Sequence, residues 1–118
     1  MKKFFSLFFL FFCLNANSHE FNPAHLIINQ SNSNLNNYDA TWMYPVKNIG
    51  KRANVIFPGI CEPMSSDPFV QGKYIIEKIT LDCNESIKGK TIEIENLSVL
   101  TDAMITINFD KDSFESLV

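Results

Sequence analysis

The side chains best suited to bind a metal lie near the beginning of the chain, at His19, Glu20 and His25. If a leader is removed after Ser18, His19 becomes the first residue and presents an α-amine beside its imidazole. That pair chelates a borderline metal such as nickel or copper, because imidazole is a common ligand and an α-amine with a pKa of about 8 readily yields its proton to a metal. Glu20 or His25 would supply a further donor, although Pro23 stiffens the path between them. The alternative is that His19 is a frayed terminal residue without a partner.

Residues for nucleophilic catalysis do not form a recognisable set. A nucleophile needs a base brought beside it, and no serine or threonine here lies in a known nucleophile motif. Carboxylates such as Glu93 and Glu95 are spread singly along the expected solvent faces of strands. Asp110-Lys111-Asp112 lacks the pattern of a calcium loop, so a hairpin turn is expected there. We therefore expect no enzymatic activity and rank a small secreted enzyme last among the possible functions.

The first residues have the three-part layout of a secretory signal. A pair of lysines is followed by an apolar run over residues 4–14 and then by small and polar residues up to Ser18. The run is shorter than the roughly 20 residues of a membrane-spanning helix, so a retained anchor is the lesser alternative. We expect residues 1–18 to be a signal peptide, with Ala16 as the second choice of cleavage site. Residues 19–118 then form one extracytoplasmic domain.

The cysteine count agrees with export. Cys13 leaves with the signal, and Cys61 and Cys83 remain as an even pair. In an oxidising compartment such a pair predicts a disulfide, whose ring from residue 61 to residue 83 is worth about 3 kcal/mol by loop entropy. A metal site built on two cysteines is disfavoured, because structural zinc takes further nitrogen or sulfur ligands and the chain has no CxxC motif.

Charge restricts the class of partner. Both charges in the signal are lysines, so the mature chain has 8 basic and 13 acidic residues and a net charge of −5. A nucleic-acid partner would require a basic surface, and this class is therefore disfavoured. No later segment has the length of a membrane-spanning helix, so we expect no membrane span in the mature chain.

Apolar residues alternate with period two through most of the mature sequence, which predicts strands. Residues 62–73 contain Pro63, Pro68 and Gly72 and are expected to form a long irregular connection. About seven short strands separated by turns predict an all-β fold, a single antiparallel β-sandwich of the Ig-like type. The expected strands cover residues 25–29, 38–44, 53–57, 74–83, 91–95, 102–109 and 113–117.

Two of these segments indicate which residues form the core. Trp42 shares a strand face with Tyr38, Ala40 and Tyr44, and a lone inward tryptophan near a disulfide is expected at the centre of a small core and not in a ligand cleft. In residues 74–83, Glu77 falls on the face that also carries four apolar side chains. A β-bulge or an edge position would accommodate this charged residue.

The order of certain residues along the chain resembles that of a known family. The set comprises a histidine after the signal, Pro23-Ala24 before a strand, Tyr38-Asp39 with Trp42 and Pro45, Pro58 with Cys61, Leu81 with Cys83, Gly89 with Ile92, Leu97, and Thr101-Asp102 before an apolar strand. In this order, over essentially the whole mature chain, the sequence resembles the extracytoplasmic N-terminal domain of the HupE/UreJ-type hydrogenase/urease accessory membrane proteins.

The resemblance implies a function and a location. In that family the domain precedes a multi-helix membrane region, and the family is associated with the uptake of nickel or a related metal. We therefore expect a non-catalytic accessory domain with a protein partner at the membrane surface, in the periplasm or on the outer face of the cytoplasmic membrane of a bacterium. The sequence given ends at Val118, so the chain is either a fragment of a longer membrane protein or a stand-alone relative without the channel. The alternative function is a periplasmic or secreted β-sandwich that binds another protein without metal.

Overall fold

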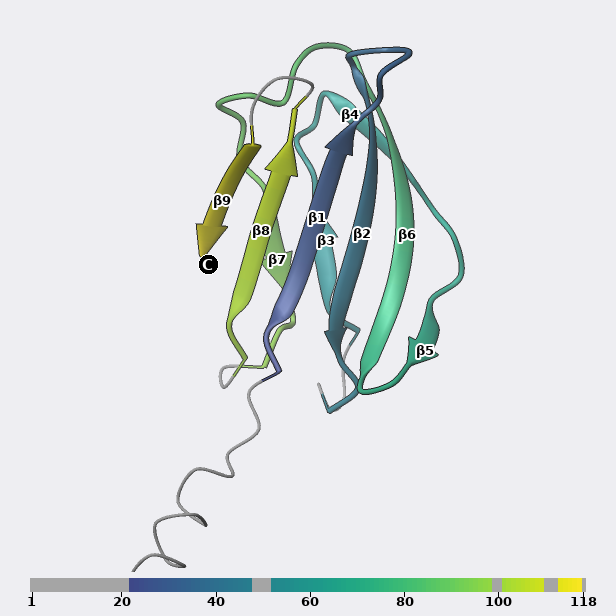
Figure 1. Cartoon of the computed structure of the whole chain (residues 1–118), viewed down its shortest axis with the longest axis vertical. Coiled ribbons are helices and arrows are strands. Elements are labelled where there is room, and N and C mark those ends of the chain that lie inside the picture. Colours follow the sequence, from purple (N-terminus) through teal and green to yellow (C-terminus); the bar gives the residue numbers. More distant parts are fainter. Residues whose placement is uncertain (1–21, 48–51, 99–100, 110–112, 118) are drawn as a thin grey trace, which may run out of the picture.

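The computed structural model describes residues 22–47, 52–98, 101–109 and 113–117, and within these ranges the chain forms strands and no helix (Figure 1). The predicted signal peptide and the predicted turn at residues 110–112 lie outside the described residues. The described strands are β1 (Ala24–Gln30), β2 (Asn37–Pro45), β3 (Asn54–Ile56), β4 (Cys61–Ser65), β5 (Phe69–Gln71), β6 (Tyr74–Cys83), β7 (Glu93–Glu95), β8 (Ala103–Asn108) and β9 (Ser113–Leu117).

The strands form two layers of unequal size. The large sheet has the order β4-β6-β2-β1-β8-β9, with β5 also paired to β6, and the small sheet consists of β3 and β7. In Figure 1 the small sheet lies behind the large one, and Val55 and Ile94 pack from it onto the core. We call the face of the large sheet that meets β3 and β7 the inner face, and its opposite the outer face.

The predicted all-β class is confirmed, with nine strands in the described ranges where about seven were expected. The large sheet is mixed, because β1 pairs antiparallel with β2 but parallel with β8. The hairpin between β1 and β2 enforces an antiparallel pair. In contrast, β8 reaches β1 only after the chain has passed through the small sheet, and that long crossover allows the parallel direction.

The prediction of an irregular connection over residues 62–73 is wrong, because β4 and β5 lie within it. The misleading signal was Pro63. The Ser66 amide donates to the Lys78 carbonyl at 2.9 Å, and bonded pairs alternate along the ladder, which leaves Pro63 at a position not bonded to β6. Since β4 is an edge strand, a proline at such a position removes no ladder bond.

The inner face carries the core. The largest fully buried side chains are those of Trp42, Tyr38, Leu26 and Ile28. The prediction for Trp42 is confirmed: its side chain is inaccessible to solvent, and its Nε1–H donates to the Ala53 carbonyl at 3.1 Å. This bond ties β2 to the segment that leads into β3.

The predicted disulfide is also confirmed. Cys61 and Cys83 lie directly opposite each other on β4 and β6, both are buried, and their Cα atoms are 3.9 Å apart. The short separation matches the closer, non-hydrogen-bonded kind of antiparallel pair. The bond therefore fastens the edge strand β4 to its neighbour β6.

Glu77 is accommodated by an ion pair. Its carboxylate lies 2.8 Å from the Arg52 guanidinium, and Glu77 is the buried charged residue of the described core. The register between β2 and β6 runs unbroken past Glu77. On the other side of β6 the register shifts by one residue between β4 and β5, so Asp67 and Pro68 together lie opposite Glu77, which is the two-against-one arrangement of the suggested β-bulge. The charge lies inside because the fold brings a cation over it.

Candidate binding face

The outer face of the large sheet carries polar and sulfur-containing side chains in rows set by the strand register. Residues paired across neighbouring strands point to the same face, so each row can be followed from strand to strand. We call the first the His25 row. It runs from β5 to β8 through Phe69, Ile76, Met43, His25 and Met104.

The next two rows become progressively more polar. The second row contains Thr41 on β2 and Lys78 on β6, and the Lys78 ammonium donates to the Thr41 hydroxyl at 3.2 Å. The third row contains Asn29 on β1 and Asn108 on β8, and Nδ2 of Asn108 donates to Oδ1 of Asn29 at 2.8 Å. The outer face therefore changes along the strands from apolar at the start of β1 to hydrogen-bonding at its end.

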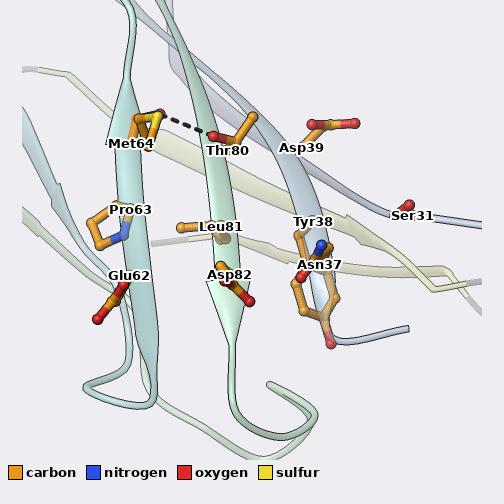
Figure 2. A pocket seen from close by; sticks show the side chains of 10 residues that line it. All are labelled: Ser31, Asn37, Tyr38, Asp39, Glu62, Pro63, Met64, Thr80, Leu81 and Asp82. Atoms are coloured by element: carbon orange, nitrogen blue, oxygen red, sulfur yellow. Dashed lines mark hydrogen bonds between the residues drawn. The ribbon is translucent and has the colours of Figure 1, made fainter. Parts of the chain in front are cut away.

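Three carboxylates end this progression and line a hollow in the surface. Asp39, Asp82 and Glu62 lie on the neighbouring strands β2, β6 and β4 and line a space of about 370 Å³. Figure 2 shows these side chains with the others that line the hollow. We call this hollow the acidic groove. A second hollow shares Asp39, Met64 and Thr80 with it and leads toward the second row. A connected depression thus follows β6 along the outer face.

The acidic groove offers hydrogen-bond acceptors. Its three carboxylates are exposed, and none of them forms an ion pair or a hydrogen bond with a described side chain. Asn37 also lines the groove, and its Oδ1 atom is buried and accepts no hydrogen bond from the described residues. A group bound here would have to donate, as lysine ammonium and arginine guanidinium groups do.

The predicted metal ligands are only partly placed. His25 is half-buried on β1, with Nε2 3.0 Å from the Thr106 hydroxyl, whereas His19 and Glu20 lie outside the described residues. Within the part of the chain that the structure describes, no three His, Cys, Asp or Glu side chains gather in a group that could hold a metal ion. The predicted set of His19, Glu20 and His25 stays a prediction.

A second polar cluster consists of Tyr44 on β2, Glu77 on β6 and Arg52, which precedes β3. Arg52 donates a hydrogen bond to Glu77 and interacts with its negative charge, and both effects raise the pKa of Arg52. Burial raises the pKa of Tyr44, while the charge of Arg52 opposes that increase. The Arg52 side chain is half-exposed, whereas that of Glu77 is buried, so the cation covers the carboxylate from the solvent side.

The acidic groove could not be predicted from the sequence, because one of the strands that form it was not expected. Asp39 and Asp82 occupy outward positions of predicted strands, and the period-two pattern would have placed both on the solvent face. Glu62 joins them only because β4 pairs with β6, and that strand lies in the segment expected to be irregular.

No family model, curated protein or solved structure matches this chain. Among the described residues, no helix has the length and apolar character needed to cross a membrane. Function is therefore inferred from the chain's own residues and from the resemblance they carry.

Proposed function

We propose that this chain is a non-catalytic extracytoplasmic accessory domain that serves membrane uptake of nickel or a related metal. It is exported by residues 1–18 and acts in the periplasm, or on the outer face of the cytoplasmic membrane, of a bacterium. Its role corresponds to that of the HupE/UreJ-type domain it resembles, and it binds a protein partner at the membrane surface.

The observation that carries this proposal is where the residues of the resemblance lie in the fold. Tyr38, Trp42 and Leu81 are buried on the inner face, and Cys61 and Cys83 form the bridge. A set of short motifs spread along the chain thus belongs to one framework, as expected if the order of the motifs reflects a shared fold. A disulfide in a domain of this size also favours an oxidising compartment.

The acidic groove supports a basic polypeptide segment as the bound group. Asp39, Glu62 and Asp82 attract lysine and arginine, and such complementarity steers association and fixes orientation. A second copy of the chain, packed groove to groove, would oppose like charges. An anionic lipid surface would be repelled for the same reason. A partner protein with basic residues near the membrane would supply the positive charges that pair with the three carboxylates of the groove.

The alternative function, a secreted or periplasmic β-sandwich that binds a protein without metal, uses the same face. It differs in predicting that the partner has no part in metal uptake. The two functions therefore make different predictions about the metal content of the cell.

The deciding experiment measures nickel in cells that lack the chain. We expect accumulation at low external nickel to fall on deletion and to be restored by the wild-type chain, but not by an acidic-groove variant with Asp39→Asn, Glu62→Gln and Asp82→Asn. A control with Glu93→Gln and Glu95→Gln, which neutralises exposed carboxylates on β7, should restore it fully. Unchanged nickel in the deletion strain would favour the alternative function. An alkaline phosphatase fusion that stays inactive would contradict export.

The predicted N-terminal ligand gives a separate test in the purified protein. Calorimetric titration of the mature chain with nickel or copper should show binding that is lost when one extra residue precedes His19, because the free α-amine is then displaced from the imidazole. Binding that is absent, or that the added residue leaves unchanged, would remove His19 from the metal site.

A further inference from the structure

Two methionines flank His25 on the outer face. In the strand register His25 pairs with Met43 on β2 and with Met104 on β8, so an imidazole lies between two thioethers on three adjacent strands. All three side chains are half-buried. Directly paired residues on one face have Cβ atoms about 5 Å apart, and methionine has three rotatable bonds that let its sulfur adapt. The three donor atoms are therefore within reach of a single ion.

The donor set is selective. Thioether sulfur is a soft ligand that favours cuprous copper, whereas nickel and zinc prefer nitrogen or thiolate, and hard cations prefer oxygen. The remaining members of the His25 row are Phe69 and Ile76, so the row supplies no carboxylate. A site made of one imidazole and two thioethers suits a soft monovalent ion.

The hydrogen bond of His25 involves one ring nitrogen and leaves the other able to bind a metal. Nε2 lies 3.0 Å from the Thr106 hydroxyl. When Nε2–H donates to that oxygen, Nδ1 keeps its lone pair and can bind a metal. A second partner that fixes the tautomer and the orientation of the ring is usual for metal-binding histidines.

The surroundings are apolar. Ile76 pairs with Met43 in the same row and is only 8% exposed, and Ile27 lies two residues beyond His25 on the same face. Apolar neighbours limit the access of water to a bound ion and control the local dielectric.

We propose that Met43, His25 and Met104 bind one cuprous ion on the outer face of the large sheet. This site is separate from the predicted N-terminal site at His19 and from the acidic groove. It extends beyond the proposed role in nickel uptake and does not depend on it.

The test measures cuprous binding under anaerobic conditions by competition with bicinchoninate, on purified protein with its disulfide intact. The protein carries one extra residue ahead of His19, which disables the predicted N-terminal chelate. We expect one ion per chain. Replacing both methionines (Met43→Leu and Met104→Leu) keeps apolar side chains of similar size but removes the sulfurs, and should weaken binding about a hundredfold. Replacing only the ring (His25→Gln), or its hydrogen-bond partner (Thr106→Val), should weaken it about tenfold or more.

The control is Met64→Leu, because Met64 is 75% exposed on β4 and lies outside the His25 row. This variant should bind as tightly as the parent. Equal affinity in the Met43 and Met104 double variant, or an equal loss in the Met64 variant, would overturn the proposal, as would a parent that binds no cuprous ion. Circular dichroism melting curves establish that each variant is folded. Failure here leaves the proposed function untouched, since that is decided by nickel accumulation in cells.

Discussion

The two faces of the large sheet are built from the same strands but have different tasks. On the inner face, Trp42 and Tyr38 are fully buried, Trp42 against Ala53 in the segment that leads into β3 and Tyr38 against Ile87 and Phe109. On the outer face, Met43 and Asp39 follow in the same strand, half-buried and exposed respectively, beside hydrogen-bonding and sulfur-containing neighbours. Because side chains alternate along a strand, adjacent residues in the sequence contribute to stability on one side and to binding on the other.

This difference also divides the residues that carry the proposed resemblance. The bridge and the core aromatic residues among them belong to the inner face. Binding specificity is expected from the outer face. Substitutions should therefore separate into those that change the free energy of unfolding and those that change only binding.

The largest effect is expected at Trp42. Replacement by alanine should lower the free energy of unfolding by about 3–5 kcal/mol, because it opens a cavity in the core and removes the donor to the Ala53 carbonyl. The measurement is urea unfolding followed by circular dichroism. The matched outer-face change, Phe69→Ala, should cost far less, because Phe69 is 45% exposed. A Trp42 variant no less stable than the Phe69 variant would contradict the assignment of faces.

The disulfide comes next. Replacing Cys61 and Cys83 by alanine should cost about 3 kcal/mol, because the unfolded chain regains the freedom of the loop that the bridge closes. Mass spectrometry after alkylation of the native protein, compared with the reduced protein, reports the bond directly. Two thiols that alkylate without a reductant would disprove the bridge.

A smaller effect is expected from the ion pair at the rim of the core. Arg52→Met leaves the buried Glu77 carboxylate without its partner and should cost about 1–3 kcal/mol, less than in a fully buried pair because the Arg52 side chain is 50% exposed. The double variant Arg52→Met with Glu77→Met should recover much of this stability. Urea unfolding of the three proteins checks the cycle. A double variant less stable than Arg52→Met would show that Glu77 is stabilised by something other than Arg52.

The sequence predicted the inner face far better than the outer one. Alternation around Trp42 and the count of cysteines are local signals, and both led to correct conclusions. Pro63 misled because a proline disfavours a strand in general, but not at an unbonded position of an edge strand. Only the three-dimensional arrangement shows whether a given proline lies at such a position.

The binding groups on the outer face depend on pairing between distant segments. Met104 reaches His25 only through the parallel pairing of β1 with β8, and Glu62 reaches Asp82 only through β4. Neither pairing leaves a local pattern in the sequence. The Arg52–Glu77 contact is of the same kind, because it joins β6 to the segment that leads into β3.

Site-specific photo-crosslinking in living cells tests the division between the faces most directly. A benzoylphenylalanine at the exposed position Thr80, which lines the acidic groove on the outer face, is compared with one at the exposed position Glu93 on β7. We predict a crosslink to one membrane protein from Thr80, lost when Asp39, Glu62 and Asp82 are neutralised, and none from Glu93. A crosslink of equal strength from Glu93, or one from Thr80 that survives neutralisation, would contradict the assignment of binding to the outer face.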